Sequence, residues 1–472
     1  MVDMMSQLHR LRRLLGVRAV QIIVGIGLAG WLLRIAAVLW YRPTCTTGAA
    51  DCYTLAGDAH YHHHQADLIS KGHWFINPNE YIVNGLIVDS AGDPPLYALY
   101  LAFWSRLGLD GVTDHRLVST LAGFALIVSL GLLVRRLAGD LAGIIAAALA
   151  AVHPLMWIND MMLLSEGLYQ PLIVAVLWAG YAWVDKPTAK RVAILGAAVS
   201  IAALTRAEAL ALFAFMVIPL VWWLGGVDWQ EKLRQTVLCG LAGLAVLSPW
   251  LIYNNLRFED PVTLSAVTGT VMMAGSCDEA WSGEAMGFWT VCFDSRELWD
   301  ELEAELPGST LRGESRVVYD ESVLDSFNQK HALEYMSDNW ERFGVVAVAR
   351  MGRSLELFKP GHSLRLNYQV EGRWEEPSTF GLGFYYALVP LTVIGGVVLR
   401  RRGVRLTPLL SMWPTIMLAS AITFGLTRYR VPIDIAMIAM SAAAVSWLFQ
   451  HLRPDSPSSP VDAAADRAAE VA

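Results

Sequence analysis

The chain has 472 residues, of which 55% are hydrophobic and 17% charged, and a formal net charge of −7 at pH 7. A soluble domain carries nearer a quarter charged residues. Apolar runs of about twenty residues recur along much of the chain, as in polytopic helical membrane proteins. The number of these runs excludes a large soluble enzyme with one membrane anchor.

Ten apolar segments are candidate membrane spans. The first follows a basic N-terminus and is too long for the core of a cleaved signal peptide, so we expect an uncleaved span. Two later segments nearly touch between Thr205 and Glu208. In chain order, we predict spans at about 17–40, 117–134, 141–157, 165–184, 191–205, 207–224, 235–253, 379–399, 405–425 and 431–449.

The loops between these segments alternate in charge. The basic loops face the cytoplasm by the positive-inside rule, which makes both termini cytoplasmic. Two long loops, about 41–116 and about 254–378, then face outward. We expect residues 1–450 to form a single membrane domain, and 451–472, which are low in bulky apolar residues, to form a disordered cytoplasmic tail. The basic loops contain Arg135, Arg136, Lys186, Lys190, Arg191, Lys232, Arg234, Arg400, Arg401, Arg402 and Arg405.

The second outward loop accounts for the acidic net charge. Between Asn255 and Phe343 there are eighteen Asp and Glu residues against six Arg and Lys residues. The remainder of the chain is therefore positive, which leaves binding of an anionic lipid open. Loops of this length without structure of their own are uncommon, so we expect short helices within it.

The cysteines agree with this sidedness. Cys45 and Cys52 lie in the first outward loop, Cys277 and Cys292 lie in the second, and Cys239 falls in a predicted span. Two short-range pairs in outward loops favour two disulfides formed in an oxidising compartment, with four unpaired thiols as the alternative. A zinc site at the first pair fits poorly, because no matching Cys/His pair is nearby.

Ionisable residues collect at the outward ends of the predicted spans. A secondary transporter usually places its substrate and ion sites near the bilayer midplane, often within repeated halves. This chain has no evident internal repeat, and a chemical site at the outer membrane surface explains the distribution better. The outward set is Arg34, Asp58, Asp93, His153, Asp160, Glu166, Arg206, Glu208, Arg353, Glu356, Arg428, Arg430 and Asp434.

Two short motifs in this set indicate phosphate binding. Thr-Arg-Ala-Glu (205–208) and Thr-Arg-Tyr-Arg (427–430) place arginines at outward helix ends. Guanidinium groups bind phosphate oxygens in a bidentate manner, and lipid headgroups supply phosphate at a membrane surface. Such arginines are also common interfacial anchors. Asp58, Asp160 and Glu166 supply carboxylates on the same side, as a general base requires.

The first outward loop also contains GDPPLY (92–97). Because Pro94 and Pro95 cannot lie inside a helix, this stretch predicts a turn followed by a short interfacial helix over YALYLAFWSRLG. Asp93 either faces the site or caps that helix.

These motifs, taken in order, resemble a known family. The order is GDAHYH (57–62), GDPPLYALYLAFW (92–104), LLSEGLY (163–169), ALTRAEALALF (203–213) and RYRVPI (428–433). It is similar to the polytopic glycosyltransferases of the C-type fold that use lipid-phosphate sugars, in particular glycosyltransferase family 39. That family includes protein O-mannosyltransferases, and the aminoarabinose transferase is related. Residues 254–292 look like actinobacterial members, and the resemblance covers most of 17–450.

The resemblance implies an all-α polytopic fold of about ten spans with interfacial helices in the outward loops. It also implies transfer of a sugar from a polyprenyl phosphate to an acceptor hydroxyl, with inversion at the anomeric carbon. Asp58 matches the family's base. Arg206 and Arg428, then Arg430, would hold the leaving phosphate.

Further residues receive secondary roles from the same resemblance. Arg34 would reach the donor phosphate or extend its charge to the membrane surface. Glu166 would orient the acceptor, the base or an arginine, or simply favour a helix N-terminus. Asp93 and His62 are assigned to the acceptor side. The family often has histidine where this chain has Asp93, which leaves the role of that position open.

The histidines of GDAHYHHHQAD (57–67) raise the question of a metal. His60 and His64 are four residues apart on one helical face, a spacing that can bind zinc. Third ligands such as Asp67, His73 or Glu80 have no diagnostic spacing. The resemblance implies that bond formation requires no cofactor. A divalent metal at His60 and His64 is the alternative to a polar interfacial helix.

The expected partners are a polyprenyl-phosphate sugar, an extracytoplasmic acceptor that is a protein, glycan or lipid, and membrane lipids, with no nucleic acid. The expected location is a bacterial plasma membrane, with the active site on the extracytoplasmic face. The main alternative is a polyprenol-linked saccharide carrier or another transporter. A third is a catalytically inactive relative acting as a subunit, against which the intact Asp58 argues.

Overall fold

The structure is a computed structural model. It describes residues 2–40, 57–223, 227–292, 296–305, 309–310, 317–369 and 371–452. Within these ranges six helices are long and apolar enough to cross a membrane, or seven if one bent pair counts as a span. They are α1 (Val2–Trp40, apolar from Val17), α5 (Val112–Ala138), α8 (Glu166–Asp185), α11 (Trp229–Asn255), α18 (Glu375–Arg401) and α21 (Val431–Leu452).

The all-α polytopic fold class predicted from the sequence is confirmed, but the remaining predicted spans are bent or short. Segment 141–157 becomes α6 (Asp140–Val152) and α7 (Pro154–Met161), bent by 52°. The bend follows from Pro154, because the residue before a proline is driven out of the helical region, and His153 is extended. The other three segments give α9 (Ala189–Ala203), α10 (Ile218–Trp223), α19 (Thr407–Leu410) and α20 (Met412–Ile422).

Single turns of 3-10 helix join these short helices. They cover Ala207–Leu210 and Thr427–Arg430, and a turn of π-helix follows the first at Phe213–Val217. Both 3-10 turns lie in the arginine-containing motifs. The backbone is thus irregular where the candidate phosphate-binding residues are located.

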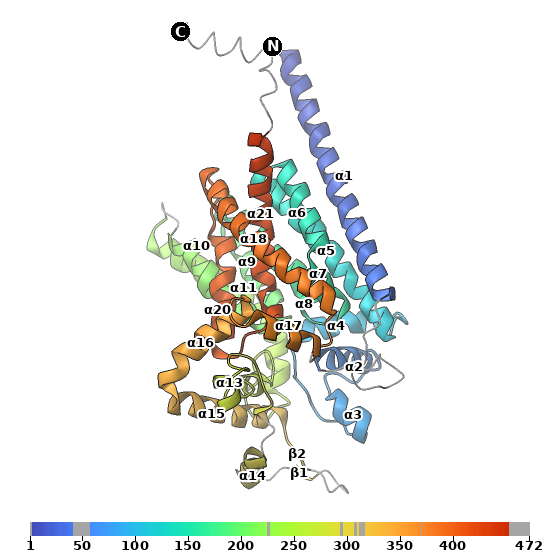
Figure 1. Cartoon of the computed structure of the whole chain (residues 1–472), viewed down its shortest axis with the longest axis vertical. Coiled ribbons are helices and arrows are strands. Elements are labelled where there is room, and N and C mark those ends of the chain that lie inside the picture. Colours follow the sequence, from blue (N-terminus) through green and yellow to red (C-terminus); the bar gives the residue numbers. More distant parts are fainter. Residues whose placement is uncertain are drawn as a thin grey trace.

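The first outward loop contributes three short helices: α2 (Asp58–Ser70), α3 (Pro78–Asn84) and α4 (Pro95–Ser105). The helix expected after GDPPLY is therefore present. The Asn77 side chain caps α3 by accepting hydrogen bonds from the backbone of Asn79 and Glu80. Helix α2 packs against α4 beside the membrane helices (Figure 1).

The second outward loop also forms short elements. They are α12 (Thr268–Met273), α13 (Asp278–Trp281), α14 (Arg296–Glu305), strands β1 (Ser309–Thr310) and β2 (Val317–Val318), α15 (Glu321–Asp338), α16 (Trp340–Ser354) and α17 (Pro360–Gln369). The predicted Cys277–Cys292 disulfide is confirmed, with Cα atoms 5.7 Å apart. Cys239 is a buried free thiol. The predicted Cys45–Cys52 pair lies outside the described residues.

Specific hydrogen bonds join the two outward loops. The Glu321 carboxylate at the start of α15 accepts from the Asn77 amide and from the backbone of Ala91, both at 2.9 Å. Arg257 donates to the carbonyls of Phe75 and Ser90 at 2.7 and 2.6 Å. The two loops therefore form one assembly over one end of the helices. The start of α1 and the end of α21 lie at the opposite end (Figure 1).

A cavity of about 530 Å³ lies among α18, α20 and α21. Its walls are almost wholly apolar and include Val393, Trp413 and Met437. It reaches Leu355 and Tyr385 on the side of the outward loops and Arg400 at the other end of α18.

Candidate active site

Asp58 is the first residue of α2 and follows a glycine in a conformation that few other residues adopt. Gly57 has φ 56°, in the left-handed region, which lets the chain turn directly into the helix. A carboxylate at a helix N-terminus is also favoured by the helix dipole. The Asp58 side chain keeps 43% of its surface exposed while it accepts a 2.6 Å hydrogen bond from Arg428.

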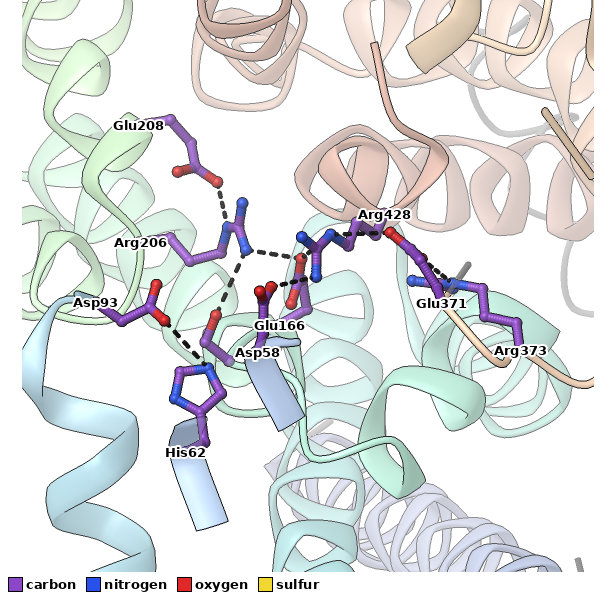
Figure 2. A network of polar contacts seen from close by, with 10 residues as sticks. Asp58, His62, Asp93, Glu166, Arg206, Glu208, Glu371, Arg373 and Arg428 are labelled. Carbon is purple, nitrogen blue, oxygen red and sulfur yellow. Dashed lines mark hydrogen bonds and ion pairs between the residues drawn. The ribbon is translucent and has the colours of Figure 1, made fainter. Parts of the chain in front are cut away.

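Two arginines from distant parts of the chain meet at Glu166. Arg206, just before the first 3-10 turn, donates to Glu166 at 2.7 Å, and Arg428, in the second 3-10 turn, lies 3.5 Å from the same oxygen. Glu166 begins α8 and is 1% exposed. The buried Glu166 therefore holds both guanidinium groups beside the exposed Asp58 (Figure 2).

The structure adds residues for which we predicted no role. Glu208 pairs with Arg206 at 2.5 Å, and Glu371 lies 3.4 Å from Arg428. Glu371 also accepts a 2.6 Å hydrogen bond from Arg373 (Figure 2). The Tyr429 ring lies 5.1 Å from the Arg206 guanidinium. Glu208 and Tyr429 fall within the two arginine motifs, whereas Glu371 and Arg373 follow α17 in a stretch without a recognisable pattern.

Asp93 and His62 form the edge of this network nearest α4. His62 Nε2 lies 3.8 Å from an Asp93 oxygen (Figure 2), and the His62 ring meets Tyr97 edge-on. Nδ1 of His62 is buried without a hydrogen-bond partner among the described residues. The interpretation of Asp93 as a helix cap is wrong, because Pro94 occupies the N-cap position of α4 and no side chain caps it.

Neighbouring charges and burial separate the pKa values of the two aspartates. The Arg428 guanidinium lowers the pKa of Asp58 to about 2, whereas burial, aided by the charge of Asp58, raises the pKa of Asp93 to about 8. Burial lowers the pKa of His62 to about 4. At neutral pH, Asp58 is thus an anion beside a neutral carboxyl and a neutral imidazole.

The structure places the other two candidate arginines elsewhere. Arg34 is fully buried and donates to Asp160 at 2.6 Å and to the carbonyls of Gly30 and Ala151. Arg430 is 2% exposed and lies between Glu356 at 3.0 Å and Asp434 at 2.9 Å. Both guanidinium groups are enclosed by acceptors, and neither joins the Asp58 network.

The histidine pair considered as an alternative metal site does not form a ligand set. The rings of His60 and His64 are 4.3 Å apart, but neither belongs to a group of three potential ligands within the described residues. One such group exists there, and it comprises His63, Asp67 and His115.

Comparisons with known proteins agree with the resemblance seen in the motifs. The family model described as dolichyl-phosphate-mannose-protein mannosyltransferase matches residues 92–253, about a third of the chain. The chain is thus similar to this family of glycosyltransferases over that range, which confirms the resemblance there. No curated protein matches the sequence significantly.

The solved structures that match this chain share little sequence with it. The archaeal oligosaccharyltransferase AglB from Archaeoglobus fulgidus, in complex with an inhibitory peptide and a dolichol-phosphate, is 14% identical with a TM-score of 0.47. ArnT from Cupriavidus metallidurans, bound to undecaprenyl phosphate, is 13% identical with a TM-score of 0.39. The alignments cover 91% and 90% of this chain, and 50% and 77% of those proteins. The chain thus spans about half the length of the archaeal enzyme.

Proposed function

We propose that this protein is a membrane glycosyltransferase that moves a sugar from a polyprenyl-phosphate donor to an acceptor hydroxyl, with inversion. One observation carries the proposal: the exposed carboxylate of Asp58 lies beside Arg428 and Arg206, which a buried Glu166 holds together. A base and a phosphate site next to each other are what such a transfer requires. The family match over 92–253 supports the same reaction class.

Asp58 acts as the general base in this mechanism. The acceptor oxygen attacks the anomeric carbon while its proton passes to the Asp58 carboxylate, so that no free alkoxide forms. The bond between that carbon and the phosphate oxygen breaks on the opposite face. The leaving polyprenyl phosphate keeps the bonding electrons, and the guanidinium groups of Arg428 and Arg206 stabilise its charge.

Donor binding also strengthens the base. In the free site the Arg428 guanidinium holds the pKa of Asp58 at about 2, too low for an effective proton acceptor. A donor phosphate competes with Asp58 for the same guanidinium. Its arrival weakens the Asp58–Arg428 pair and brings a second negative charge nearby, and both effects raise the pKa of Asp58.

The apolar cavity among α18, α20 and α21 suits the donor's polyprenyl chain. Its outer end reaches Tyr385, whose ring lies 3.6 Å from the guanidinium of Arg430, two residues after Arg428. The acceptor approaches from the outward loops. Near Asp58, Glu166 Oε2 at the start of α8 and His62 Nδ1 in α2 are buried atoms without hydrogen-bond partners among the described residues. Both can bind an acceptor hydroxyl.

The orientation follows from charge. The basic ends of α5 and α18, with Arg135, Arg136, Arg400 and Arg401, are their C-terminal ends, away from the outward loops. By the positive-inside rule that end is cytoplasmic, together with both chain termini. The active site then lies on the extracytoplasmic face of a bacterial plasma membrane.

Two linked experiments test this function. Mass spectrometry of a deletion strain should find an accumulated polyprenyl-phosphate sugar and a glycosylated product missing. The purified protein in lipid nanodiscs, supplied with that lipid and the unmodified acceptor, should transfer the sugar. Asp58→Asn should transfer it roughly 100- to 10,000-fold more slowly, the usual range for losing a general base.

Asp110→Asn is the matched control, because Asp110 is an exposed carboxylate in the same outward loop. It should retain the wild-type rate. A well-folded Asp58→Asn protein with wild-type activity would contradict the mechanism. Wild-type protein that moves the lipid-linked sugar across proteoliposomes without consuming it would instead establish a carrier.

A further inference from the structure

Three potential metal ligands meet where α2 packs on the start of α5. They are His63 and Asp67 from α2 and His115 from α5. One ligand atom from each lies within 4.8 Å of the other two. His63 and His115 are 6% and 0% exposed, so the cluster is enclosed, and it plays no part in the proposed transfer.

The contacts within the cluster are close. His63 Nδ1 and His115 Nδ1 are 2.9 Å apart. His63 Nε2 lies 3.9 Å from Asp67 Oδ2, and His115 Nε2 lies 3.9 Å from Asp67 Oδ1. The Ser105 hydroxyl of α4 lies 2.7 Å from His115 Nε2 and 3.0 Å from an Asp67 oxygen. Two imidazole nitrogens at this separation share a hydrogen bond, in which one carries a proton that the other accepts, and a bound cation would have to take the place of that proton.

We propose that His63, Asp67 and His115 bind a divalent transition metal ion, with zinc as the best fit. Two imidazoles and a carboxylate are a donor set that zinc prefers over calcium or magnesium, which favour oxygen ligands alone. Tetrahedral zinc with ligands at about 2.0–2.1 Å needs ligand atoms roughly 3.3 Å apart. The three ligand atoms lie within 4.8 Å of one another, so the side chains would have to close by up to about 1.5 Å around the ion. A water molecule or the Ser105 hydroxyl completes the coordination.

The metal would position the base rather than take part in the reaction. Asp67 is nine residues after Asp58, roughly 14 Å along the helix axis, so the ion does not touch the reacting atoms. It would instead tie α2 to α5. Because Asp58 is the first residue of α2, fixing that helix also fixes the direction of the carboxylate beside Arg428.

Metal content of the full chain tests the site directly. The protein is purified in nanodiscs with an affinity tag that contains no histidine, stripped with a chelator and equilibrated with zinc. We expect about one zinc ion per chain. Competition with a chromogenic chelator should show more than roughly 100-fold weaker binding for His63→Gln and for Asp67→Asn, beyond the usual cost of losing an outer-shell partner.

His60→Gln is the matched control, because it removes a histidine from the same helix that lies outside the cluster. It should bind zinc as the wild type does. The site is disproved if the wild type takes up no stoichiometric zinc, if His60→Gln loses the ion, or if Asp58→Asn loses it. Should the ligand variants misfold, cobalt bound to the wild type must show the visible spectrum of a tetrahedral nitrogen–oxygen site, and its absence disproves the proposal.

Discussion

Arg428 and Arg430 lie two residues apart in one 3-10 turn, yet they belong to opposite kinds of charged network. Arg428 contacts the half-exposed Asp58, whereas Arg430 is enclosed by Glu356 and Asp434, which are 2% and 0% exposed. A 3-10 helix has three residues per turn, so positions two apart point in directions about 120° apart. The same turn therefore supplies one arginine to the substrate side and one to the interior.

The two networks differ in how far a ligand can reach their charged groups. The enclosed network pairs Arg430 with the buried Glu356 and Asp434, and the arginine stacks on Tyr385, although Asp434 Oδ2 has no hydrogen-bond partner among the described residues. The open network leaves Asp58 partly exposed and Glu166 Oε2 without a partner among the described residues. Both networks thus contain a buried oxygen without a partner, and the exposed Asp58 is what lets the open network reach a ligand.

The largest expected effect comes from breaking the enclosed network. Arg430→Gln leaves the buried carboxylates of Glu356 and Asp434 without their cation, and this should lower the free energy of unfolding by about 3–5 kcal/mol. Denaturant unfolding in mixed micelles measures it. Arg428→Gln is the comparison and should cost less, because the buried Glu166 keeps Arg206 as a cation at 2.7 Å and Asp58 is 43% exposed. An equal loss of unfolding free energy in the two variants would contradict the distinction between the enclosed and the open network.

Substitutions in the open network, which joins Asp58, Arg428, Arg206 and Glu166, should lower the transfer rate more than the free energy of unfolding. Arg206→Gln removes one cation from the leaving phosphate, while Arg428 stays 3.5 Å from Glu166 and limits the structural damage. We expect a loss of about 100- to 1,000-fold in kcat, as for removal of one oxyanion donor. Steady-state kinetics in nanodiscs measures it. A change confined to the KM for the acceptor would assign Arg206 to acceptor binding instead.

The smallest effect concerns pH. Burial raises the pKa of Asp93 to about 8, and the charged or titratable groups that face it are Asp58, His62, Glu166, Arg206 and Arg428. Wild-type activity should fall as pH rises through about 8, because ionised Asp93 repels the donor phosphate and opposes the charge that develops on it as it leaves. Asp93→Asn mimics the neutral carboxyl, so it should match the wild type at pH 7 and keep its activity at higher pH.

Stability should follow the same titration. The folded protein holds the Asp93 proton more tightly than the unfolded chain does, so the contribution of this group decreases from pH 3.8 up to about 8. Asp93→Asn should remove that dependence, which pH-dependent unfolding detects. A wild-type rate profile that is flat across pH 8 would show that Asp93 already ionises at neutral pH.

The sequence predicted the fold class and the open network better than it predicted the pairing of charges. Asp58 and Arg428 are 370 residues apart, but both lie in motifs at outward span ends, and a common membrane side brings such ends near each other. The same reasoning selected Arg34 and Arg430 without distinction. Arg34 meets its buried partner because α1 packs against α7, and Arg430 meets Glu356 because the 3-10 turn packs against the segment after α16. No local sequence pattern predicts this packing.

The cluster at α2 shows the same limit. Spacing alone favoured His60 and His64, because it counts only residues on one helix. The group that forms recruits His115 from α5, 52 residues after His63, and the spacing of the first histidines gives no sign of it. Likewise, three predicted spans are short helices in the structure. Hydropathy predicts the length of an apolar segment, but it does not predict the irregular turns at the arginine motifs.

The cavity among α18, α20 and α21 bears on which donor concentration sets the reaction rate, the one in water or the one in the membrane. In the proposed function, a polyprenyl chain that enters the cavity from the bilayer does not pass through bulk water, so the rate should depend on the donor's mole fraction in the membrane. Adding inert lipid at a fixed total donor concentration should slow the reaction, just as diluting a soluble substrate would. The polyprenyl phosphate product would return to the membrane. There it would compete with the donor for the site as long as it remains in that leaflet.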